Sequence, residues 1–173
     1  MGSQPFIVTA ELPVDIFSWA NGLRCTHFPP ERNHLAAHVT LFHAFAPSLR
    51  RELVGVLARL AQECPAPVAR IENVMDLGRG TALEIRSPDM LAIRAEIAAH
   101  FHGALIAQDS HAPRLHITIQ NKVERPRAAA LQAELAAALK PRKFAFTGLG
   151  LHLYLDPKWQ QLNIWKFRGK QGG

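Results

Sequence analysis

Two four-residue segments, His38-Val39-Thr40-Leu41 and His116-Ile117-Thr118-Ile119, share one pattern: a histidine, a β-branched residue, a threonine and an aliphatic residue. Each segment lies in an apolar stretch typical of a β-strand. Side chains on a strand point alternately to opposite faces, so the histidine and the threonine of each segment lie on the same face. The residues between them point to the other face, where we expect them to pack in the core.

Two such strands facing each other across a groove would bring two imidazoles and two hydroxyls together. In-line displacement at phosphorus uses this set: one neutral imidazole, of His38 or His116, takes a proton from the attacking water or hydroxyl, and the other gives one to the leaving oxygen. Histidine holds either state near neutral pH because its unperturbed pKa is about 6.5. The hydroxyls of Thr40 and Thr118 would donate hydrogen bonds to the non-bridging phosphate oxygens. This chemistry requires no metal, and the sequence does not assign which histidine is the acid.

The pattern resembles the signature of the two-histidine phosphoesterase superfamily, and within it the bacterial enzymes called 2′-5′ RNA ligases or RNA 2′,3′-cyclic phosphodiesterases. The resemblance covers most of the chain: both segments and their spacing, an opening strand followed by Pro13, and a closing pair of strands. It implies a two-lobed α+β fold with pseudo-two-fold symmetry and a catalytic groove between the lobes. It also implies His38 and His116 as the catalytic pair, and Thr40 and Thr118 as the residues that bind the phosphate, without a cofactor.

Members of this family act on RNA 2′,3′-cyclic phosphates, leaving a 2′-phosphate, or on 2′-5′ linkages, which some also form. By resemblance, this chain would act on RNA or on another cyclic-phosphate nucleotide. Many members have an aromatic residue and Leu-Gly after the first segment, where this chain has Phe42-His43-Ala44-Phe45. Many have a nearby Arg after the second, where it has Gln120-Asn121-Lys122. On a regular strand Phe42 would share the face of His38, to stack on a base or pack in the core, and His43 would turn to the core.

Hydrophobic periodicity and turn residues predict the remaining elements. Expected helices span residues 13–23, 47–64, 88–101 and 126–140, and expected strands span residues 6–12, 36–45, 68–77, 82–85, 114–121, 143–155 and 162–167. Phe17, Ala20 and Leu23 have the spacing of a buried face in the first helix. Hairpin turns favour antiparallel pairing, so we expect an α+β fold. It would form a single two-lobed domain over residues 1–173, with mainly antiparallel sheets, helices packed on the outside, a central groove and a flexible tail over residues 169–173.

The composition is that of a soluble globular protein, with 48% hydrophobic and 20% charged residues. The net charge of +6 favours anionic partners such as RNA, although scattered basic residues are also typical of an ordinary solvated surface. Residues 1–6 lack the pattern of a signal peptide and no apolar stretch is long enough to span a membrane, so we expect a cytoplasmic protein, and a monomer. The two cysteines, Cys25 and Cys64, are expected to be buried thiols.

Nine histidines raise the alternative of a metal site. Metal ligands usually include a carboxylate or a thiolate near the histidines, and no acidic residue directly flanks either segment; Asp109 lies seven residues before His116. Two further alternatives remain open: an RNA-binding module that keeps the groove without turnover, and a phosphodiesterase for a small cyclic nucleotide phosphate. Paired imidazoles favour the enzyme, since recognition alone needs cationic side chains more than imidazoles.

Overall fold

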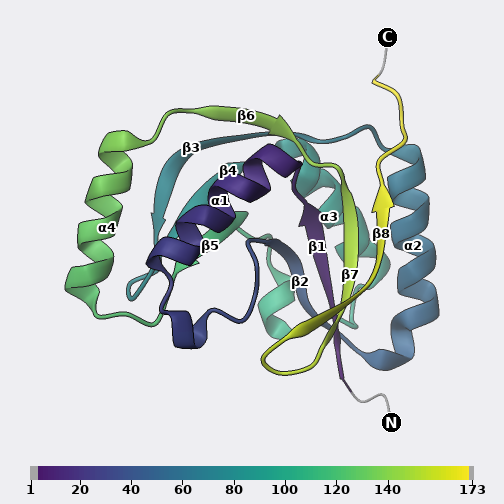
Figure 1. Cartoon of the computed structure of the whole chain (residues 1–173). Helices are drawn as coiled ribbons and strands as arrows, with labels where there is room; N and C mark the ends of the chain where they lie inside the picture. Colours follow the sequence, from purple (N-terminus) through teal and green to yellow (C-terminus); the bar gives the residue numbers. More distant parts are fainter. Residues whose placement is uncertain (1–3, 172–173) are drawn as a thin grey trace.

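Over residues 4–171, which the computed structural model describes, the chain forms two four-stranded sheets and four α-helices (Figure 1). The helices are α1 (Val14–His27), α2 (Arg50–Glu63), α3 (Pro88–His100) and α4 (Arg125–Ala138), with short 3-10 turns at Pro30–Arg32, Pro47–Leu49 and Ala107–Ser110. The strands are β1 (Phe6–Glu11), β2 (Val39–Phe45), β3 (Val68–Asp76), β4 (Thr81–Arg86), β5 (His116–Gln120), β6 (Arg142–Ala145), β7 (Gly148–Tyr154) and β8 (Trp159–Lys166).

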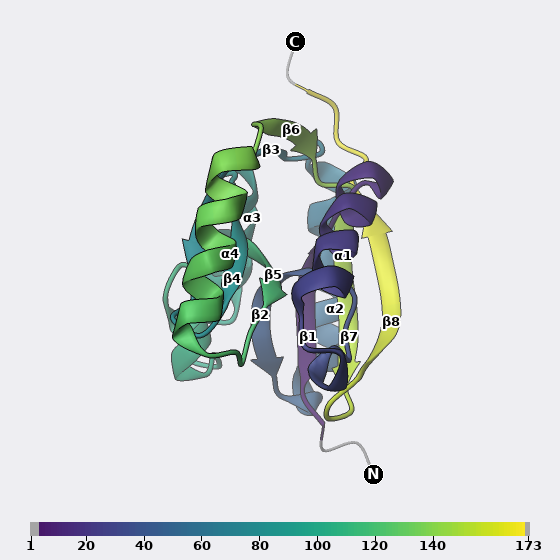
Figure 2. The same ribbon diagram turned by 60° about the vertical axis from the view of Figure 1, so that its left-hand side comes forward.

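The two sheets are built on the same plan. One has the strand order β2-β1-β7-β8 and the other β5-β4-β3-β6, and neighbouring strands are antiparallel in both. The unit β1-α1-β2-α2 of the first sheet corresponds to β4-α3-β5-α4 of the second, which puts β2 and β5 at equivalent edges. Figure 2 shows the two halves side by side, with α4 and β4 on one side and β1, β7 and β8 on the other. The predicted α+β fold with pseudo-two-fold, antiparallel lobes is confirmed.

The helices pack outside the sheets, and one of them crosses between the halves. Helix α2 packs against β7 and β8, whereas α3 and α4 pack against β3. Helix α1 belongs to the first half by sequence but packs against β5 of the second. Its buried residues are therefore Ile16, Ala20 and Arg24, whereas Phe17 is 36% exposed. The buried face predicted from spacing is wrong, because the helix is rotated about its axis relative to that prediction. Of the two cysteines expected to be buried, Cys25 is exposed and Cys64 is partly buried.

A β-bulge in β2 changes the direction of the side chains that follow the first His-x-Thr segment. Thr40 pairs with Thr9 of β1, but Val8 pairs with Phe42, so β2 has one extra residue at this point. The bulge turns Phe42 into the core, where it is fully buried, and leaves His43 exposed. The predicted inward direction of His43 is wrong because it assumed regular alternation, which a bulge interrupts.

The expected strand over residues 143–155 is in fact two strands in different sheets. Strand β6 pairs with β3 and β7 pairs with β1. Between them, the N–H of Phe146 donates to the carbonyl of Pro67 and the N–H of Thr147 donates to that of Glu11, so the chain changes sheets here. A continuous β-pattern carries no signal for such a change. At the far end the N–H of Gly169 donates to the carbonyl of Cys64, and residues 172–173 of the predicted tail lie outside the described residues.

Candidate active site

His38 and His116 are held in the same way at the start of equivalent edge strands. His38 lies directly before β2, and His116 is the first residue of β5. The Nδ1 atom of His38 lies 2.8 Å from the carbonyl oxygen of Ala36, and Nδ1 of His116 lies 2.7 Å from that of Arg114. A carbonyl oxygen only accepts, so each Nδ1 carries a proton and each neutral imidazole presents the lone pair of Nε2. The repeated fold thus selects the same tautomer for both histidines.

The strands that carry the two His-x-Thr segments meet where the halves of the molecule join. Strands β2 and β5 are edge strands of different sheets and contact each other near the centre of the molecule (Figure 2). Thr40 and Thr118 are both half-buried. Within residues 4–171, neither hydroxyl has a hydrogen-bond partner. Each therefore remains available to donate to a bound anion.

The surroundings of His38 favour its neutral form. Burial lowers its pKa to about 4, the hydrogen bond to Ala36 opposes this change, and the charges of Arg24, His152 and His116 lower it further. The influence of His116 places the two imidazoles within electrostatic reach of each other. In the free protein at neutral pH, His38 is uncharged. A bound anion would raise its pKa, because a nearby negative charge favours the protonated imidazole.

A pocket of about 310 Å³ opens beside His38. Strand β1, the start of α1, the segment before β2 and the β7–β8 hairpin form its walls, with Glu11, Phe17, His152, Trp159 and Gln161 among the lining side chains. The ring centroid of Trp159 lies 4.6 Å from that of His38 and 5.6 Å from that of His152. Sequence reasoning placed none of these five residues in the site. His116 does not line the pocket, which therefore belongs to the His38 side of the site.

Thr9, Glu11 and His152 form a hydrogen-bonded group in this pocket. Thr9 Oγ1 donates to Glu11 Oε2 over 2.7 Å, so His152 Nε2, which lies 2.9 Å from the same hydroxyl, donates to it. Burial lowers the pKa of His152; burial raises the pKa of Glu11, and the bond from Thr9 opposes that rise. The Thr-x-Glu spacing on an expected strand was the signal that would have placed Thr9 and Glu11 on one face.

Gly150 makes room for this group. It pairs with Thr9 across β1 and β7, and a Cβ added at Gly150 would lie 2.5 Å from Thr9 Oγ1 and 2.9 Å from Glu11 Oε2. Real side chains do not approach so closely, so a larger residue would displace one or both polar atoms. The polar group therefore depends on a glycine in the neighbouring strand.

Asp109 holds the outer edge of β2, next to the first His-x-Thr segment. Its carboxylate is fully buried and accepts hydrogen bonds from the backbone N–H groups of His43 and Ala44, at 2.9 and 3.1 Å, and from His43 Nδ1 at 2.9 Å. Burial raises the pKa of Asp109, but the bonds from His43 and Ala44 outweigh it and hold that pKa below its usual value. The carboxylate thus supplies the acceptors that a further strand would otherwise provide.

Neither a metal-binding cluster nor a membrane-spanning helix is present among the described residues. Residues 4–171 contain no group of three or more histidine, cysteine, aspartate or glutamate side chains placed to hold a metal ion. None of the helices in that range combines the length and apolar character needed to cross a membrane.

A family comparison assigns the chain. The model of the 2′-5′ RNA ligase superfamily matches residues 12–158, a range that includes both His-x-Thr segments. The chain belongs to the 2′-5′ RNA ligase superfamily. The resemblance inferred from the sequence is confirmed at this level, and membership in the 2′-5′ RNA ligase superfamily supports a phosphoesterase with two histidines. No curated protein matches the chain significantly.

Solved structures share the fold of this member of the 2′-5′ RNA ligase superfamily. TT0787 of Thermus thermophilus is 16% identical with a TM-score of 0.70, and the match covers 96% of this chain and 100% of that one. E. coli LigT in complex with 3′-AMP is 19% identical with a TM-score of 0.63, covering 95% and 98%. E. coli LigT in complex with NADP+ is 18% identical with a TM-score of 0.63, covering 96% and 99%. At these identities the likeness establishes the fold.

Proposed function

We propose that the chain is a metal-independent phosphodiesterase that opens RNA 2′,3′-cyclic phosphate ends to give a 2′-phosphate, with reversible 2′-5′ ligation at the same site. The observation that carries the proposal is the matched setting of His38 and His116. Each imidazole has its Nδ1 held by the carbonyl two residues earlier, which leaves Nε2 as the reactive nitrogen on both. A single ligand imidazole would need no such symmetry, whereas a general acid and a general base on opposite sides of one phosphorus do.

In the proposed reaction, Nε2 of one histidine removes a proton from water as the oxygen attacks phosphorus. The bond from phosphorus to the 3′ oxygen breaks, and Nε2–H of the other histidine protonates that oxygen, which leaves a 2′-phosphate. Thr40 and Thr118 donate to the non-bridging oxygens, where negative charge accumulates. The half-burial of both threonines strengthens these hydrogen bonds, since little water competes for them.

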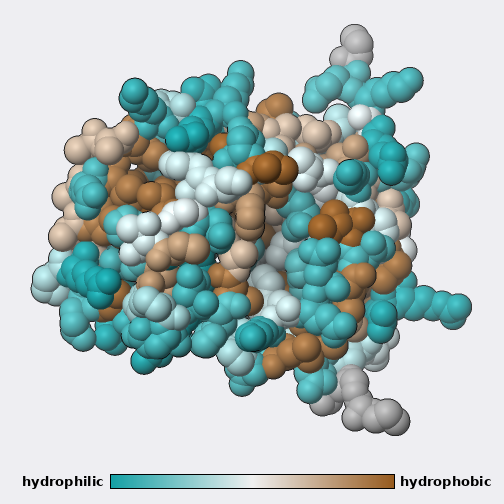
Figure 3. All heavy atoms as spheres, viewed as in Figure 1, coloured by the Kyte–Doolittle hydropathy of each residue, from teal (hydrophilic) through white to brown (hydrophobic). Residues whose placement is uncertain are grey.

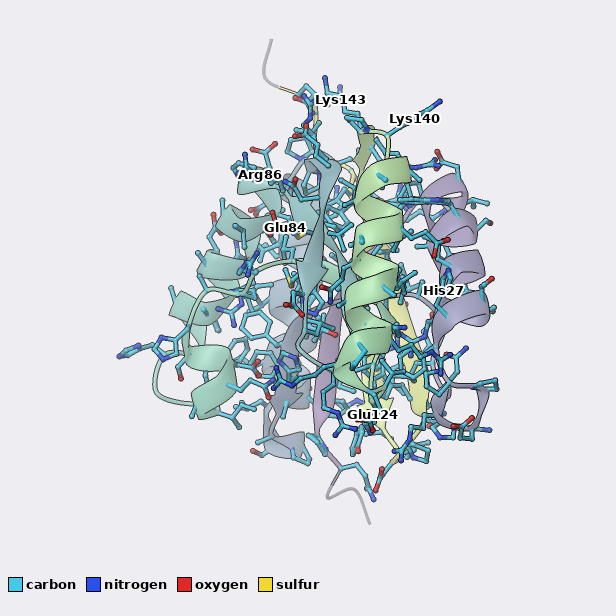
Figure 4. The ribbon with its side chains drawn as sticks, turned by 90° about the vertical axis from the view of Figure 1, so that its left-hand side faces the viewer. His27, Glu84, Arg86, Glu124, Lys140 and Lys143 are labelled. Carbon is cyan, nitrogen blue, oxygen red and sulfur yellow. The ribbon has the colours of Figure 1, made fainter. Side chains whose placement is uncertain are left out.

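The charge near His116 supports RNA as the substrate. A second pocket, of about 540 Å³, lies at the ends of β3, β4 and β5, and its lining includes Arg70, Arg86, Arg114 and Lys143. Arg114 is the residue whose carbonyl holds His116, so this pocket adjoins the site. Arg114 and Arg70 are paired with Glu84 and Glu72, so Arg86 and Lys143 carry the excess positive charge of the pocket. Figure 4 shows Arg86 and Lys143 along this side of the molecule, with Glu84 near them. Basic residues that continue beyond a reaction centre suit a polyanion longer than a single nucleotide.

The ligands bound by a structural neighbour also support a nucleotide substrate. LigT, whose fold this chain shares, has been crystallised with 3′-AMP, NADP+, ATP and phosphate.

We also propose that the protein acts in the cytoplasm and as a monomer.

The test is turnover of a short RNA ending in a 2′,3′-cyclic phosphate, in EDTA, with the product identified by phosphorus NMR. A 2′-phosphate product is expected. If turnover is absent in EDTA and is restored by a divalent metal, the metal-independent mechanism is wrong. Turnover of 2′,3′-cyclic mononucleotides alone would move the substrate to the small cyclic nucleotides, and RNA binding without any turnover would make the chain a binding module.

A further inference from the structure

The pocket beside His38 is built for a group other than phosphate. Its one acidic side chain belongs to Glu11, the last residue of β1, and would repel an anion. The remaining walls are largely aromatic or aliphatic, with Phe17 and Trp159 among the aromatic members. A planar, uncharged group with hydrogen-bond donors on its edge satisfies both features, and a nucleobase is such a group.

The position of the pocket fits a base attached to the reacting phosphate. His38 lines the pocket, and Trp159 packs directly on its imidazole. Thr40, the proposed phosphate ligand, pairs with Thr9, which bonds to Glu11, so the phosphate and base positions lie on neighbouring strands of one sheet. The volume of about 310 Å³ is at the small end of ligand pockets and suits one base rather than a longer segment.

The aromatic side chains supply surfaces for stacking. Phe17 is 36% exposed on α1 although it is a large apolar residue, because α1 is rotated to bury Ile16 and Arg24 instead. Figure 3 shows that the face carrying α1 and the β7–β8 hairpin has groups of hydrophobic residues interspersed with hydrophilic ones. Stacking of a base on an aromatic ring contributes to binding for every base.

The carboxylate of Glu11 favours a base that presents two adjacent hydrogen-bond donors. Its Oε2 accepts from Thr9, and a carboxylate has further lone pairs, so Glu11 can accept additional N–H groups. Guanine presents two adjacent donors, N1–H and the N2 amino group. Adenine and cytosine present one amino group beside a ring nitrogen that accepts, and uracil presents one N–H between two carbonyls, so each would bring an acceptor against the carboxylate. The amide of Gln161, also in the pocket, can donate to O6 of guanine.

We propose that this pocket binds the guanine base of the nucleotide whose cyclic phosphate is opened by His38 and His116. The inference rests on the proposed function, since it names the terminal base of the same substrate. The preorganised state of Glu11, held by Thr9 and made possible by Gly150, gives the carboxylate a fixed position before the base arrives.

The first test compares kcat/KM for the 2′,3′-cyclic phosphates of guanosine, adenosine, cytidine and uridine. The guanosine substrate is expected to be best by at least about tenfold, because a buried polar site rejects bases that leave it unpaired. In Glu11→Gln, the guanosine value is expected to fall by about tenfold or more, chiefly through KM, and the other three to change little or rise. Glu134→Gln, an exposed substitution on α4, is the matched control and should leave all four values unchanged.

The second test needs no turnover. Quenching of Trp159 fluorescence by guanosine 2′-monophosphate is compared with quenching by the other three nucleotides, and Trp159→Phe identifies the signal. Tighter binding of the guanosine nucleotide in the wild type, lost in Glu11→Gln, supports the pocket even if hydrolysis is absent. Equal binding and equal turnover of all four bases in the wild type would overturn the inference while leaving the proposed function intact. Absence of turnover together with guanosine-selective binding would overturn the function and retain the pocket.

Discussion

The guanidinium of Arg24, in helix α1 of the first half, donates a hydrogen bond of 2.9 Å to the backbone carbonyl of Thr118 in the second half. The same side chain donates to Asn33 Oδ1 at 2.8 Å and lies 4.2 Å from the ring centroid of Phe28. Arg24 therefore connects the loop before β2 to the strand that carries the second His-x-Thr segment. Its side chain is almost fully buried, and burial lowers its pKa.

Arg94 of α3 makes the reciprocal connection. Its Nε donates to the carbonyl of Leu41 in β2 over 3.1 Å, its Nη2 donates to the carbonyl of Asp109, and its guanidinium lies 4.1 Å from the ring centroid of Phe42. Each half of the molecule thus contributes one buried arginine that donates hydrogen bonds to the backbone of the other half's edge strand. The pair fixes the two His-x-Thr strands relative to each other.

Removal of one of these arginines should weaken both stability and catalysis. Arg24→Met is expected to lower the free energy of unfolding by about 2–4 kcal/mol, since buried acceptors lose a charged donor. It should also lower kcat/KM, because β5 loses its connection to the first half. Denaturant unfolding and steady-state kinetics measure the two effects. Arg59→Met, at an exposed ion pair with Glu63, is the matched control and should change stability by less than about 1 kcal/mol. Equal effects of the two substitutions would refute the role of Arg24.

Each of the two histidines should be essential to turnover and dispensable for folding. His38→Ala and His116→Ala are each expected to lower kcat by about 10²- to 10⁴-fold, as for loss of a general acid or base. Thermal unfolding should show a small change, since neither side chain is in the core. His111→Ala, at an exposed histidine in the loop before β5, should retain wild-type kcat. Near-wild-type turnover in either active-site variant would eliminate the two-histidine mechanism.

The threonine hydroxyls should act on the transition state. Thr40→Val and Thr118→Val keep the shape of the side chain and remove the donor, and each is expected to lower kcat by about 10²-fold. Thr40→Ser and Thr118→Ser keep the hydroxyl and should recover most of the activity. Steady-state kinetics on all four variants make the comparison. A serine variant as impaired as its valine counterpart would mean that the methyl group, and not the hydroxyl, is what matters.

The pKa of His38 is expected to be far below that of an ordinary histidine in the free protein, about 4 as the structure indicates. Addition of inorganic phosphate should raise it, because the anion favours the imidazolium. NMR titration of the imidazole resonances, assigned with His38→Gln, measures both values. A free-protein pKa near 6.5 that phosphate leaves unchanged would contradict this account of the site.

The same shift has a consequence for stability. A folded-state pKa below the unfolded value means that protonation favours unfolding, so the contribution of neutral His38 is complete above about pH 6.5 and declines as the pH falls toward 4. His38→Gln should therefore lose less stability than the wild type between about pH 7 and pH 4. Unfolding curves at several pH values test this difference, and parallel pH profiles for the two proteins would exclude it.

Asp109 should be required for the edge of β2. Asp109→Asn replaces one acceptor by an amide N–H that faces the N–H groups of His43 and Ala44, and is expected to cost about 3 kcal/mol of stability. Asp89→Asn, at an exposed position in the first turn of α3, should cost less than about 1 kcal/mol. Denaturant midpoints of the two variants show whether the buried carboxylate is structural; a loss no larger than that of the control would show that it is not.

Local pattern in the sequence was sufficient to find the strands and helices, most of their starts, and the pair of His-x-Thr segments. These features depend on residues a few positions apart: alternation places His38 beside Thr40, and Ser87 with Pro88 begins α3, where the Ser87 hydroxyl accepts from the N–H of Met90. The resemblance to the family rested on the same kind of local feature, which occurs twice in the chain. The pseudo-two-fold symmetry of the fold was implied by the family resemblance that the two segments carry.

The details of the site depended on long-range pairing. The rotation of α1 that exposes Phe17 follows from its packing on β5, and the bulge that buries Phe42 follows from its pairing with β1. The Thr9–Glu11–His152 group joins residues from opposite ends of the chain, through the pairing of β1 with β7. Sequence alone determined that two histidines and two threonines stand on matching strands. Only the tertiary structure decided which other side chains surround them, because contacts between distant segments are set by how whole sheets and helices pack, and no short pattern records that.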